Sequence, residues 1–395
     1  MTRAGRGRYV QGRWAPDPGA QTRRARLGGV YLAFVPDPIS ELEVALPTAV
    51  AGELESATLA IAHLNDSAVE SPPLEGVSRQ LLRSESLASS RIEGLEVGHR
   101  RIAIADFDEL ADDAKAADII GNIRAMQQAI EIAAGSDPID PDALLKIHRT
   151  LLRFGADEPI AGRWRESQGW IGGMYPESAV YVPPPPDEVL GLVEDLCQFL
   201  QRDDMPALFQ AAVAHAQFET IHPFVDGNGR VGRCLIHAVL RRRGLTPRYV
   251  PPISLILAAQ SDAYFAGLEA YRSEDEGMYG WTAFFAETAS IAAGEAGRLA
   301  TDIQSLQERW VDRFPRPPRS DAAARRILAL LPAYPILNIA IAMRELSISD
   351  RAAGEGLGQL QEAGIVRLIT KRVHGRAWEC PDMFTLVQEF EHSLR

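Results

Sequence analysis

The chain has 395 residues, 46% of them hydrophobic, which is enough for two or three domains with packed cores. Its formal net charge of −12 argues against a protein that coats nucleic acid or an anionic membrane. Three widely spaced cysteines without a Cys-x-x-Cys pair suit a reducing compartment and exclude a zinc ribbon: Cys197, Cys234 and Cys380. Because the chain has no run of 18 apolar residues and no signal-peptide core at its N-terminus, we expect a cytoplasmic protein.

Hydrophobic periodicity predicts a mainly α protein in which one hairpin is the conspicuous β element. Residues 1–28 are rich in Arg and Gly and lack an apolar period, so we expect a flexible basic arm. Order should begin near Val30–Pro36, in an N-terminal helical region at residues 29–135. From there on, helices are expected at about 47–64, 77–92, 118–133, 142–154, 187–201, 206–220, 227–243, 261–272 and 279–310.

Residues 89–94, at the end of the second of these helices, read Ser-Ser-Arg-Ile-Glu-Gly. Ser90 and Glu93 have the spacing of a capping box. Glu93 followed by Gly94 also has the form of a helix end with glycine at C′. Taken alone, the segment is explained by helix capping.

A hairpin is expected over residues 169–182, which read Gly-Trp-Ile-Gly-Gly-Met-Tyr-Pro-Glu-Ser-Ala-Val-Tyr-Val. Apolar and aromatic β-formers lie on both sides of a Gly/Pro turn. Prolines at 183–186 end the hairpin before a helix opens near Asp187. A plain surface hairpin is one interpretation of this stretch.

The most informative stretch is residues 222–233, His-Pro-Phe-Val-Asp-Gly-Asn-Gly-Arg-Val-Gly-Arg. His222 can take a proton near neutral pH, and the glycines let backbone N–H groups approach an anion closely. Arg230 and Arg233 lie three apart, so they share a face of the helix expected from Gly227 and can bind successive phosphates. Because helix N-termini also favour anions, the stretch predicts a site for nucleotide phosphates. A surface helix–loop–helix with a Gly-rich turn is the alternative.

At these residues the chain resembles the Fic (Fic/Doc) family, whose signature is His-Pro-Phe-x-Asp/Glu-Gly-Asn-Gly-Arg-x-x-Arg, and every specified position is matched. The resemblance implies a Fic-type helical bundle, placed here at residues 136–312, that transfers AMP from ATP to a Ser, Thr or Tyr hydroxyl of a target protein. His222 would be the general base and Asp226 the Mg²⁺ ligand. The nucleotide-binding residues implied are Phe224, Gly227, Asn228, Gly229, Arg230 and Arg233. Self-modification and homodimerisation are further partner expectations.

The resemblance also gives residues 89–94 a role, because they are similar to the inhibitory motif Ser/Thr-x-x-x-Glu-Gly/Asn of many such proteins. The specified positions are Ser89, Glu93 and Gly94. In that resemblance Glu93 pairs with Arg233 and blocks productive seating of the ATP γ-phosphate.

Two further assignments follow from the resemblance. The hairpin would be a flap that pairs with an extended target segment, as in strand addition to a sheet edge. The flap residues are Trp170, Ile171, Gly172, Gly173, Tyr181 and Val182. Tyr264 lies where the family often has two tyrosines near the nucleotide; stacking on adenine and core packing are both open for it.

A Pro-rich linker at 313–320 leads to a C-terminal domain at 321–395. Helices expected at 322–331, 337–346 and 350–363, followed by strands at 365–369 and 373–379, resemble a winged helix-turn-helix. If this domain bound DNA, the 350–363 helix would enter the major groove. From Arg319 onwards, however, ten Lys/Arg face nine Asp/Glu, so protein docking or dimerisation is equally open. The alternative function is therefore a transcriptional or protein-docking regulator whose Fic site senses nucleotide or removes AMP.

Overall fold

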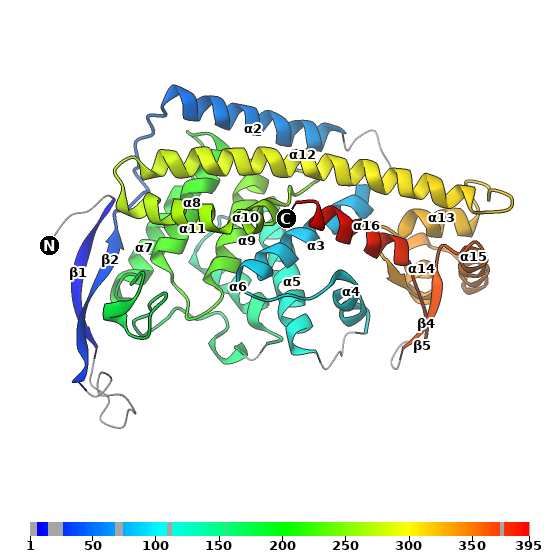
Figure 1. The fold of residues 1–395 in the computed structure, drawn as a ribbon, viewed down its shortest axis with the longest axis horizontal. Helices are drawn as coiled ribbons and strands as arrows, with labels where there is room; N and C mark the ends of the chain where they lie inside the picture. The colour runs from blue at the N-terminus through cyan, green and yellow to red at the C-terminus, as the bar shows by residue number, and fades with distance from the viewer. Residues whose placement is uncertain are drawn as a thin grey trace. The chain divides into compact units, whose positions relative to one another are not determined.

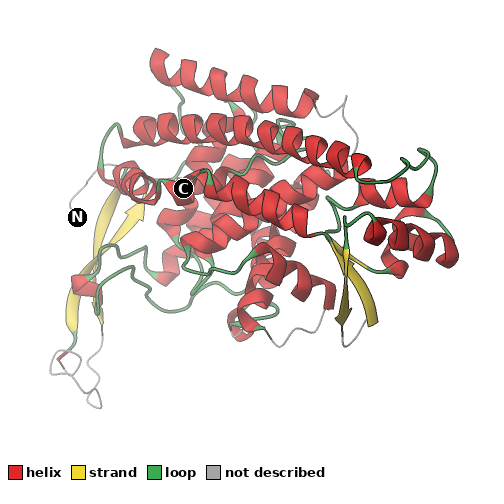
Figure 2. Ribbon diagram, turned by 45° about the vertical axis from the view of Figure 1, so that its right-hand side comes forward, coloured by secondary structure: helices red, strands yellow, loops and turns green. Residues whose placement is uncertain are grey.

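A computed structural model describes residues 6–14, 27–67, 74–108, 113–155, 157–371 and 375–394, and helices make up most of this part of the chain (Figure 1). The strands lie in two small antiparallel sheets, which Figure 2 shows in yellow. One sheet pairs β1 with β2, and the other has the order β3-β5-β4. The mainly α class predicted from the sequence is confirmed. None of the described helices has the length and apolar character needed to cross a bilayer.

The chain divides into two compact units, each assembled from separate stretches. The first unit consists of residues 1–58, 124–245 and 260–287, and the second of residues 59–123, 246–259 and 288–395. Three helices have residues in both units: α2 (Thr48–Ser67), α5 (Ala114–Ala134) and α12 (Gly277–Asp312).

The first unit is organised around α8 (Ala207–Ile221), a helix that is apolar on every side and buried almost throughout. Its contacts include the helices before and after it, because a helix without a polar face needs cover all round. The other helices of this unit are α6 (Pro141–Leu152), α7 (Pro186–Leu200), α9 (Asn228–Arg242) and α11 (Ser261–Ser273). Each lies within a few residues of its predicted range.

The prediction of a flexible arm at residues 1–28 is wrong for residues 7–14. Residues 7–14 form β1 (Gly7–Trp14), which pairs antiparallel with β2 (Gly29–Pro36) from Gly7 opposite Pro36 to Trp14 opposite Gly29. The partner strand supplies the apolar part of this ribbon, since Ala33, Phe34 and Val35 are buried. An Arg/Gly-rich strand without an apolar period of its own can thus be ordered by pairing. The rest of the arm, residues 1–5 and 15–26, lies outside the described residues.

The second unit contains α3 (Leu74–Ile92), α4 (His99–Asp108) and α10 (Ile253–Ala259). A buried carboxylate joins α3 to α10, because Glu85 accepts hydrogen bonds from the Ser254 amide at 2.7 Å and the Ser254 hydroxyl at 2.5 Å. The sequence predicted α3, but neither α4 nor α10 was expected.

The C-terminal elements of the second unit follow the predicted order. They are α13 (Ala323–Leu330), β3 (Ile336–Leu337), α14 (Ile339–Leu346), α15 (Asp350–Glu362), β4 (Arg367–Lys371), β5 (Gly375–Glu379) and α16 (Pro381–His392). The Ser349 side chain caps α15 by accepting from the Ala352 amide, and Gly364 follows the helix with a positive φ of 67°. Neither β3 nor the final helix α16 was predicted, and residues 373 and 374 of the second expected strand lie outside the described residues.

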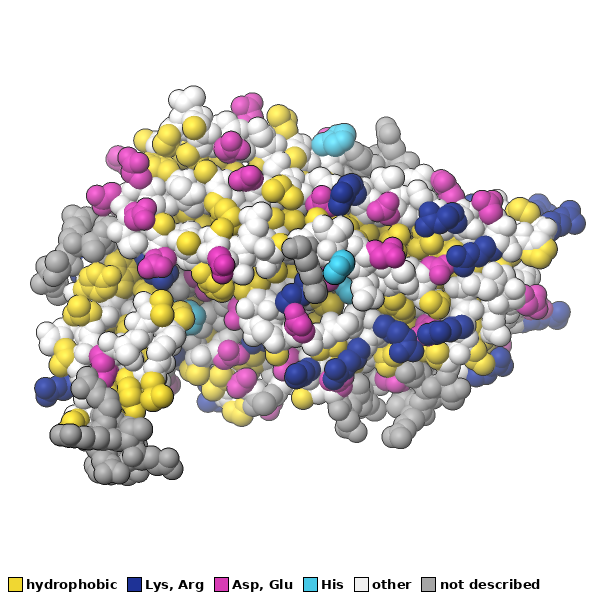
Figure 3. All heavy atoms as spheres, viewed as in Figure 1, with side chains coloured by type: hydrophobic (Ala, Val, Ile, Leu, Met, Phe, Trp, Pro, Cys, Tyr) yellow, Lys and Arg dark blue, Asp and Glu magenta, His cyan; other side chains and the backbone are white. Residues whose placement is uncertain are grey.

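Two residues of α15, the helix that would enter the major groove if the domain bound DNA, face the protein interior. Ala353 is fully buried, and a Cβ on Gly356 would lie 2.8 Å from Ile327 Cδ1. These two positions therefore serve packing. On the face shown in Figure 3, Lys and Arg gather over the C-terminal elements with Asp and Glu among them. Three arginines of the C-terminal elements are paired with acids: Arg344 with Glu345, Arg351 with Glu355 and Arg367 with Glu379.

Candidate active site

His222 ends α8 in a strained backbone conformation. Its φ of 49° and ψ of 60° are left-handed, while its amide still donates to Phe218 O at 2.9 Å. In the described part of the chain, only Ser347 is another non-glycine residue with positive φ. Such conformations cost about 1–3 kcal/mol and collect at functional sites. The imidazole is partly exposed, and its Nδ1 lies 4.0 Å from Glu219 Oε2.

The loop after His222 is closed by one side chain. Asn228 Oδ1 accepts from the Phe224 amide at 2.8 Å, and Asn228 Nδ2 donates to the Phe224 carbonyl at 2.9 Å. Gly227, with a φ of 80°, then starts α9 in a conformation that only glycine adopts readily. A Cβ there would lie 2.9 Å from Leu151 Cδ2. The loop is therefore locked before the first turn of α9, whose N–H groups have no intrahelical acceptors.

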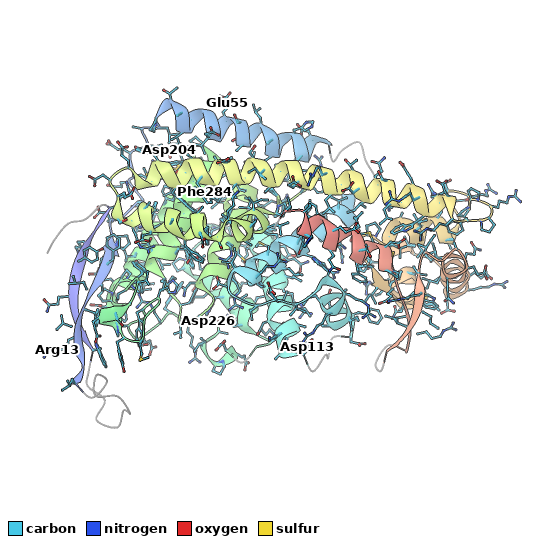
Figure 4. The ribbon with its side chains drawn as sticks, viewed as in Figure 1. Arg13, Glu55, Asp113, Asp204, Asp226 and Phe284 are labelled. Atoms are coloured by element: carbon cyan, nitrogen blue, oxygen red, sulfur yellow. The ribbon has the colours of Figure 1, made fainter. Side chains whose placement is uncertain are left out.

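Asp226 is the exposed carboxylate of this loop (labelled in Figure 4), with half of its side chain accessible. Its Oδ2 accepts from Arg230 Nη2 at 2.6 Å across one helical turn. The Arg230 side chain is only 7% exposed, and its Nε is buried without a hydrogen-bond acceptor. A buried donor left without an acceptor is costly, which makes this guanidinium suited to an anionic ligand.

Arg233 lies one turn further along α9 and is completely buried. Its Nη1 is 3.5 Å from the hydroxyl of Tyr264, and that hydroxyl is 2.9 Å from His215 Nε2. Tyr264 is 1% exposed and packs against Trp281. The ring has no open face for an adenine, so Tyr264 bears on the site through Arg233.

A third buried guanidinium, that of Arg165, supports the loop after His222. Arg165 Nε donates to the carbonyl of His222 at 2.8 Å, and Arg165 Nη2 donates to the carbonyl of Pro184 at 2.5 Å. No carboxylate neutralises it in the contacts described, and burial lowers its pKa to about 10. Arg165 therefore links the strained residue at the end of α8 to the base of the hairpin.

His148 on α6 holds the other side of the loop. Its Nδ1 accepts from the Gly162 amide at 2.9 Å, so its Nε2 is the protonated nitrogen that donates to the Asp226 carbonyl at 3.0 Å. The ring stacks on Phe224 with centroids 3.7 Å apart. Burial lowers the pKa of His148 to about 4, so the imidazole is neutral at physiological pH. Phe224 is 1% exposed, which places it in the loop's support rather than on its surface.

The predicted hairpin at 169–182 is present in a reduced form. Ile171 and Tyr181 form a single antiparallel bridge, with the Ile171 amide donating to Tyr181 O at 2.8 Å. A short 3-10 turn at Pro176–Ser178 lies in its tip, and both Gly172 and Gly173 have positive φ. The tip is thus a folded loop rather than a ladder of strand pairs.

The hairpin is fixed at its base and apolar at its surface. The Tyr181 hydroxyl donates to the carbonyl of Thr220, two residues before His222, at 2.6 Å. By contrast, Trp170 and Ile171 are about two-fifths exposed and Val180 is 75% exposed. An apolar surface of this kind, held next to the end of α8, is suited to contact with another chain.

The N-terminal ribbon braces this hairpin. The Phe34 amide of β2 donates to Val182 O at 2.9 Å. Trp14 of β1 stacks on Tyr175 with centroids 5.2 Å apart and donates to Glu177 Oε2 at 2.6 Å. Residues assigned from the sequence to a flexible arm therefore support the hairpin.

Residues 89–94 belong to the second unit, where they end α3. The Gly94 amide donates to Arg91 O at 2.9 Å and the Leu95 amide donates to Ser90 O at 3.0 Å, which is the Schellman pattern with glycine at C′. The helix-end interpretation is confirmed, whereas Ser90 does not start a helix as a capping box requires. Its hydroxyl accepts from Asn122 Nδ2 at 3.0 Å, and Ser89 is fully buried. Glu93 is thereby presented at a well-defined helix end.

Comparison with known proteins agrees with this geometry. Residues 138–240 match the profile of the Fic/DOC family, and residues 51–131 match the Fic/DOC family N-terminal profile. These matches place residues 51–131 and 138–240 in the Fic/DOC family. The chain is 33% identical over 118 residues to the protein adenylyltransferase fic-1 of Caenorhabditis elegans and 36% identical over 112 residues to the protein adenylyltransferase Fic of Drosophila virilis.

These alignments cover 29% and 27% of this chain and 22% and 21% of the relatives, so the chain spans about a fifth of the length of the curated relatives it matches. A crystal structure of a Fic family protein from Desulfovibrio desulfuricans G20 superposes with a TM-score of 0.54 at 22% identity. That superposition covers 85% of this chain and 97% of the other. A Fic domain protein from Bacteroides thetaiotaomicron gives 0.51 at 17% identity, over 62% and 97%. At these identities the likeness concerns the fold.

Proposed function

We propose that the protein is an adenylyltransferase that moves AMP from ATP to a hydroxyl side chain of a target protein. The observation that carries the proposal is the loop from His222 to Arg233. It joins a strained imidazole, a half-exposed carboxylate and the first turn of a helix lined by two buried arginines. This is a site built for a nucleotide chain of phosphates, beside a group that can take a proton.

In the proposed reaction the target hydroxyl oxygen attacks the α-phosphorus of ATP. The new bond joins that oxygen to phosphorus, and the bond from phosphorus to the bridging oxygen of the β-phosphate breaks, so pyrophosphate leaves. His222 takes the hydroxyl proton. The α-phosphate would lie at the first turn of α9, whose N–H groups point towards it, as they do towards anions at helix N-termini.

The two arginines of α9 would bind the remaining phosphates. Arg230, with its buried donor, and Arg233 would hold the β- and γ-phosphates. Tyr264 would set the orientation of Arg233 through its hydroxyl. This assignment takes the place of the direct adenine contact considered from the sequence.

Mg²⁺ fits this site through one carboxylate. No group of three or more His, Cys, Asp or Glu side chains able to hold a metal occurs among the described residues. Mg²⁺ in nucleotide sites is held by one or two carboxylates together with substrate phosphates and water. Asp226 supplies the carboxylate, half exposed at the loop surface. When bound, the ion would neutralise charge on the phosphates.

The hairpin would present the target. The edge of the hairpin beside the Ile171–Tyr181 bridge would pair with an extended target segment through main-chain hydrogen bonds, and the exposed side chains of Trp170, Ile171 and Val180 would contact that segment. Because Tyr181 fixes the hairpin to Thr220, a hydroxyl on the paired segment would be held at a set distance from His222.

We further propose that Glu93 restrains the activity by pairing with Arg233 and keeping the γ-phosphate from its productive place. The rigid helix end at Gly94, supported by the Asn122 contact to Ser90, gives the Glu93 carboxylate a fixed base. A restraint of this kind needs a fixed position, because a mobile carboxylate would lose entropy on pairing.

The test is intact-mass analysis of purified protein incubated with ATP and Mg²⁺. Glu93→Gly is expected to acquire AMP faster than wild type, through rate rather than ATP affinity. The double variant Glu93→Gly, Arg233→Ala should lose the gain, since release needs Arg233. Glu96→Gly is the matched control and should behave as wild type. Equal labelling of wild type and Glu93→Gly would refute the restraint.

A further inference from the structure

A buried carboxylate from the C-terminal helix binds the chain on both sides of Glu93. Arg91 Nη2 donates to Glu391 Oε2 at 2.7 Å. His99 Nε2 lies 2.7 Å from the other oxygen, Glu391 Oε1. The three side chains are 18%, 12% and 6% exposed for Arg91, His99 and Glu391. All belong to the second unit, in which α16 contacts α3 and α4.

A second buried carboxylate extends the contact by one residue. Glu379 at the end of β5 is completely buried and accepts from Arg100 Nε at 2.8 Å. Its other oxygen accepts from Arg367 of β4. We call Glu379 and Glu391 the carboxylate clamp. Three basic residues within ten positions around Glu93 are therefore bound to this clamp.

Because its carboxylates are buried and charged, the hydrogen bonds of the clamp are expected to form together and to break together. A buried ionised carboxylate is costly unless its oxygens are bonded, and each oxygen of Glu391 has its own partner. Burial opposes the ionisation of Glu391, but the hydrogen bonds and charges of His99 and Arg91 outweigh it and keep its pKa below the ordinary value. A partly undocked segment would leave a buried charge without its partner, so intermediate positions are disfavoured.

The body of α3 is fastened to the same part of the chain. Gln80 Nε2 donates to the carbonyl of Pro332 at 2.6 Å, and the Arg79 guanidinium lies 4.3 Å from the centroid of the Tyr334 ring. The C-terminal elements thus contact α3 both along its length, at Arg79 and Gln80, and at its end, at Arg91.

We propose that the carboxylate clamp holds residues 89–94 in their restraining position, so that the C-terminal domain controls the activity of the catalytic unit. The inference rests on the proposed roles of the active site and of Glu93. When α16 leaves its place, Arg91 and His99 lose their common acceptor Glu391, and the helix end that carries Glu93 keeps only the contact of Arg100 with Glu379. A partner that binds the C-terminal domain and displaces α16 would switch the enzyme on.

A cavity beside the clamp leaves room for its side chains to separate. A cavity of about 420 Å³ borders it, with Arg91, His99 and Glu391 in its wall and apolar Leu95 and Phe384 beside them. The side chains of the clamp can therefore separate without first disrupting a closed core.

The test compares labelling rates of Glu391→Ala, Glu93→Gly and the double variant with ATP and Mg²⁺. Glu391→Ala should raise self-labelling about five-fold or more, at the lower end of the usual coupling between two sites. In the Glu93→Gly background the same change should have no further effect, because the restraint is already gone. Glu389→Ala, on the exposed side of α16, is the matched control and should label like wild type.

Two outcomes separate the inference from the proposed function. If Glu93→Gly labels itself rapidly but Glu391→Ala labels itself only as fast as Glu389→Ala, the clamp does not control the activity and the inference fails. If Glu93→Gly acquires no AMP, the proposed function fails instead. Amide hydrogen exchange tests the role of the clamp independently of activity. In the Glu391→Gln variant, the amides of residues 95–98 should exchange faster than in wild type, while those of α15 keep their protection. Unchanged exchange there would overturn the inference even if the alanine variant were poorly folded.

Discussion

The loop after His222 and the segment around Glu93 are held by different kinds of contact. Around His222 and Asp226 the supporting side chains of His148, Arg165 and Asn228 bind backbone carbonyls and amides. Around Glu93 the support comes from Arg91 and His99, whose side chains bind the Glu391 carboxylate 300 and 292 positions away. The first arrangement fixes a shape, and the second connects two distant parts of the chain.

The difference has a physical consequence. A loop locked by buried hydrogen bonds to its own backbone is expected to keep its form with or without nucleotide, which suits a group that must meet a transition state. Ion pairs between separate elements can exchange partners, so they suit a region that must move. Variants in the loop should therefore change chemistry, and variants around Glu93 should change how much of the protein is active.

The largest effect is expected at the base. His222→Ala should lower the rate of AMP transfer about 10²- to 10⁴-fold, because a general base acts only in the transition state. ATP affinity and the unfolding midpoint should stay near their wild-type values. Labelling rates measured in the Glu93→Gly background check this, with the exposed His392→Ala as control. A variant that labels at the parental rate would remove His222 from the mechanism.

Loss of the metal ligand should come next. Asp226→Ala is expected to reduce transfer about 10²-fold and to flatten the dependence of rate on Mg²⁺ concentration, since the ion neutralises charge on the phosphates. Titration of Mg²⁺ against the labelling rate measures both. A titration curve with its midpoint unchanged would show that another group holds the ion.

A smaller effect is expected from Arg165, which touches no substrate but holds the His222 carbonyl. Arg165→Met should lower kcat about 10- to 10²-fold with little change in the KM for ATP, because the base and the hairpin lose their common support. Arg165→Lys should recover part of the loss. If instead the KM for ATP rises and kcat is unchanged, Arg165 acts on nucleotide binding.

A further effect, on stability at low pH and not on the chemistry, is expected from His148. Its pKa is about 4 in the folded protein and 6.5 in its ordinary state, because burial opposes the charge. Between these values the unfolded chain binds a proton that the folded protein does not, so stability falls as pH falls from 6.5 towards 4. The loss should reach about 3 kcal/mol and level off below that range.

Urea unfolding at a series of pH values checks the role of His148. The buried His215, whose pKa is about 3 for the same reason, adds to the wild-type slope and remains in His148→Gln. The difference between the two proteins therefore isolates His148. Parallel stability curves for wild type and variant would contradict the assignment.

Local patterns in the sequence predicted most helices and the residues that meet at the loop. The motif from His222 to Arg233 is contiguous, so its members were bound to lie together once the helices on either side formed. The C-terminal elements were predictable in the same way, since Ser349 and Gly364 mark the ends of α15.

The supporting residues were not predictable, because their signals are ordinary ones. His148 is a single histidine on the apolar face of a helix, and Arg165 stands next to Glu166 in a polar stretch that gives no sign of burial. β1 lacks an apolar period and is ordered by its partner strand. The pairing of Arg91 with Glu391 joins residues 300 positions apart, and nothing local to either indicates the other.

The central claim is that this site transfers AMP from ATP. The direct measurement incubates Glu93→Gly with Mg²⁺ and ATP labelled at the α-phosphate or, in a parallel sample, at the γ-phosphate. The account predicts covalent label on protein from the α-labelled nucleotide alone, and none when His222 is also replaced by alanine. Label from the γ-labelled nucleotide, or an equal signal without His222, would contradict it.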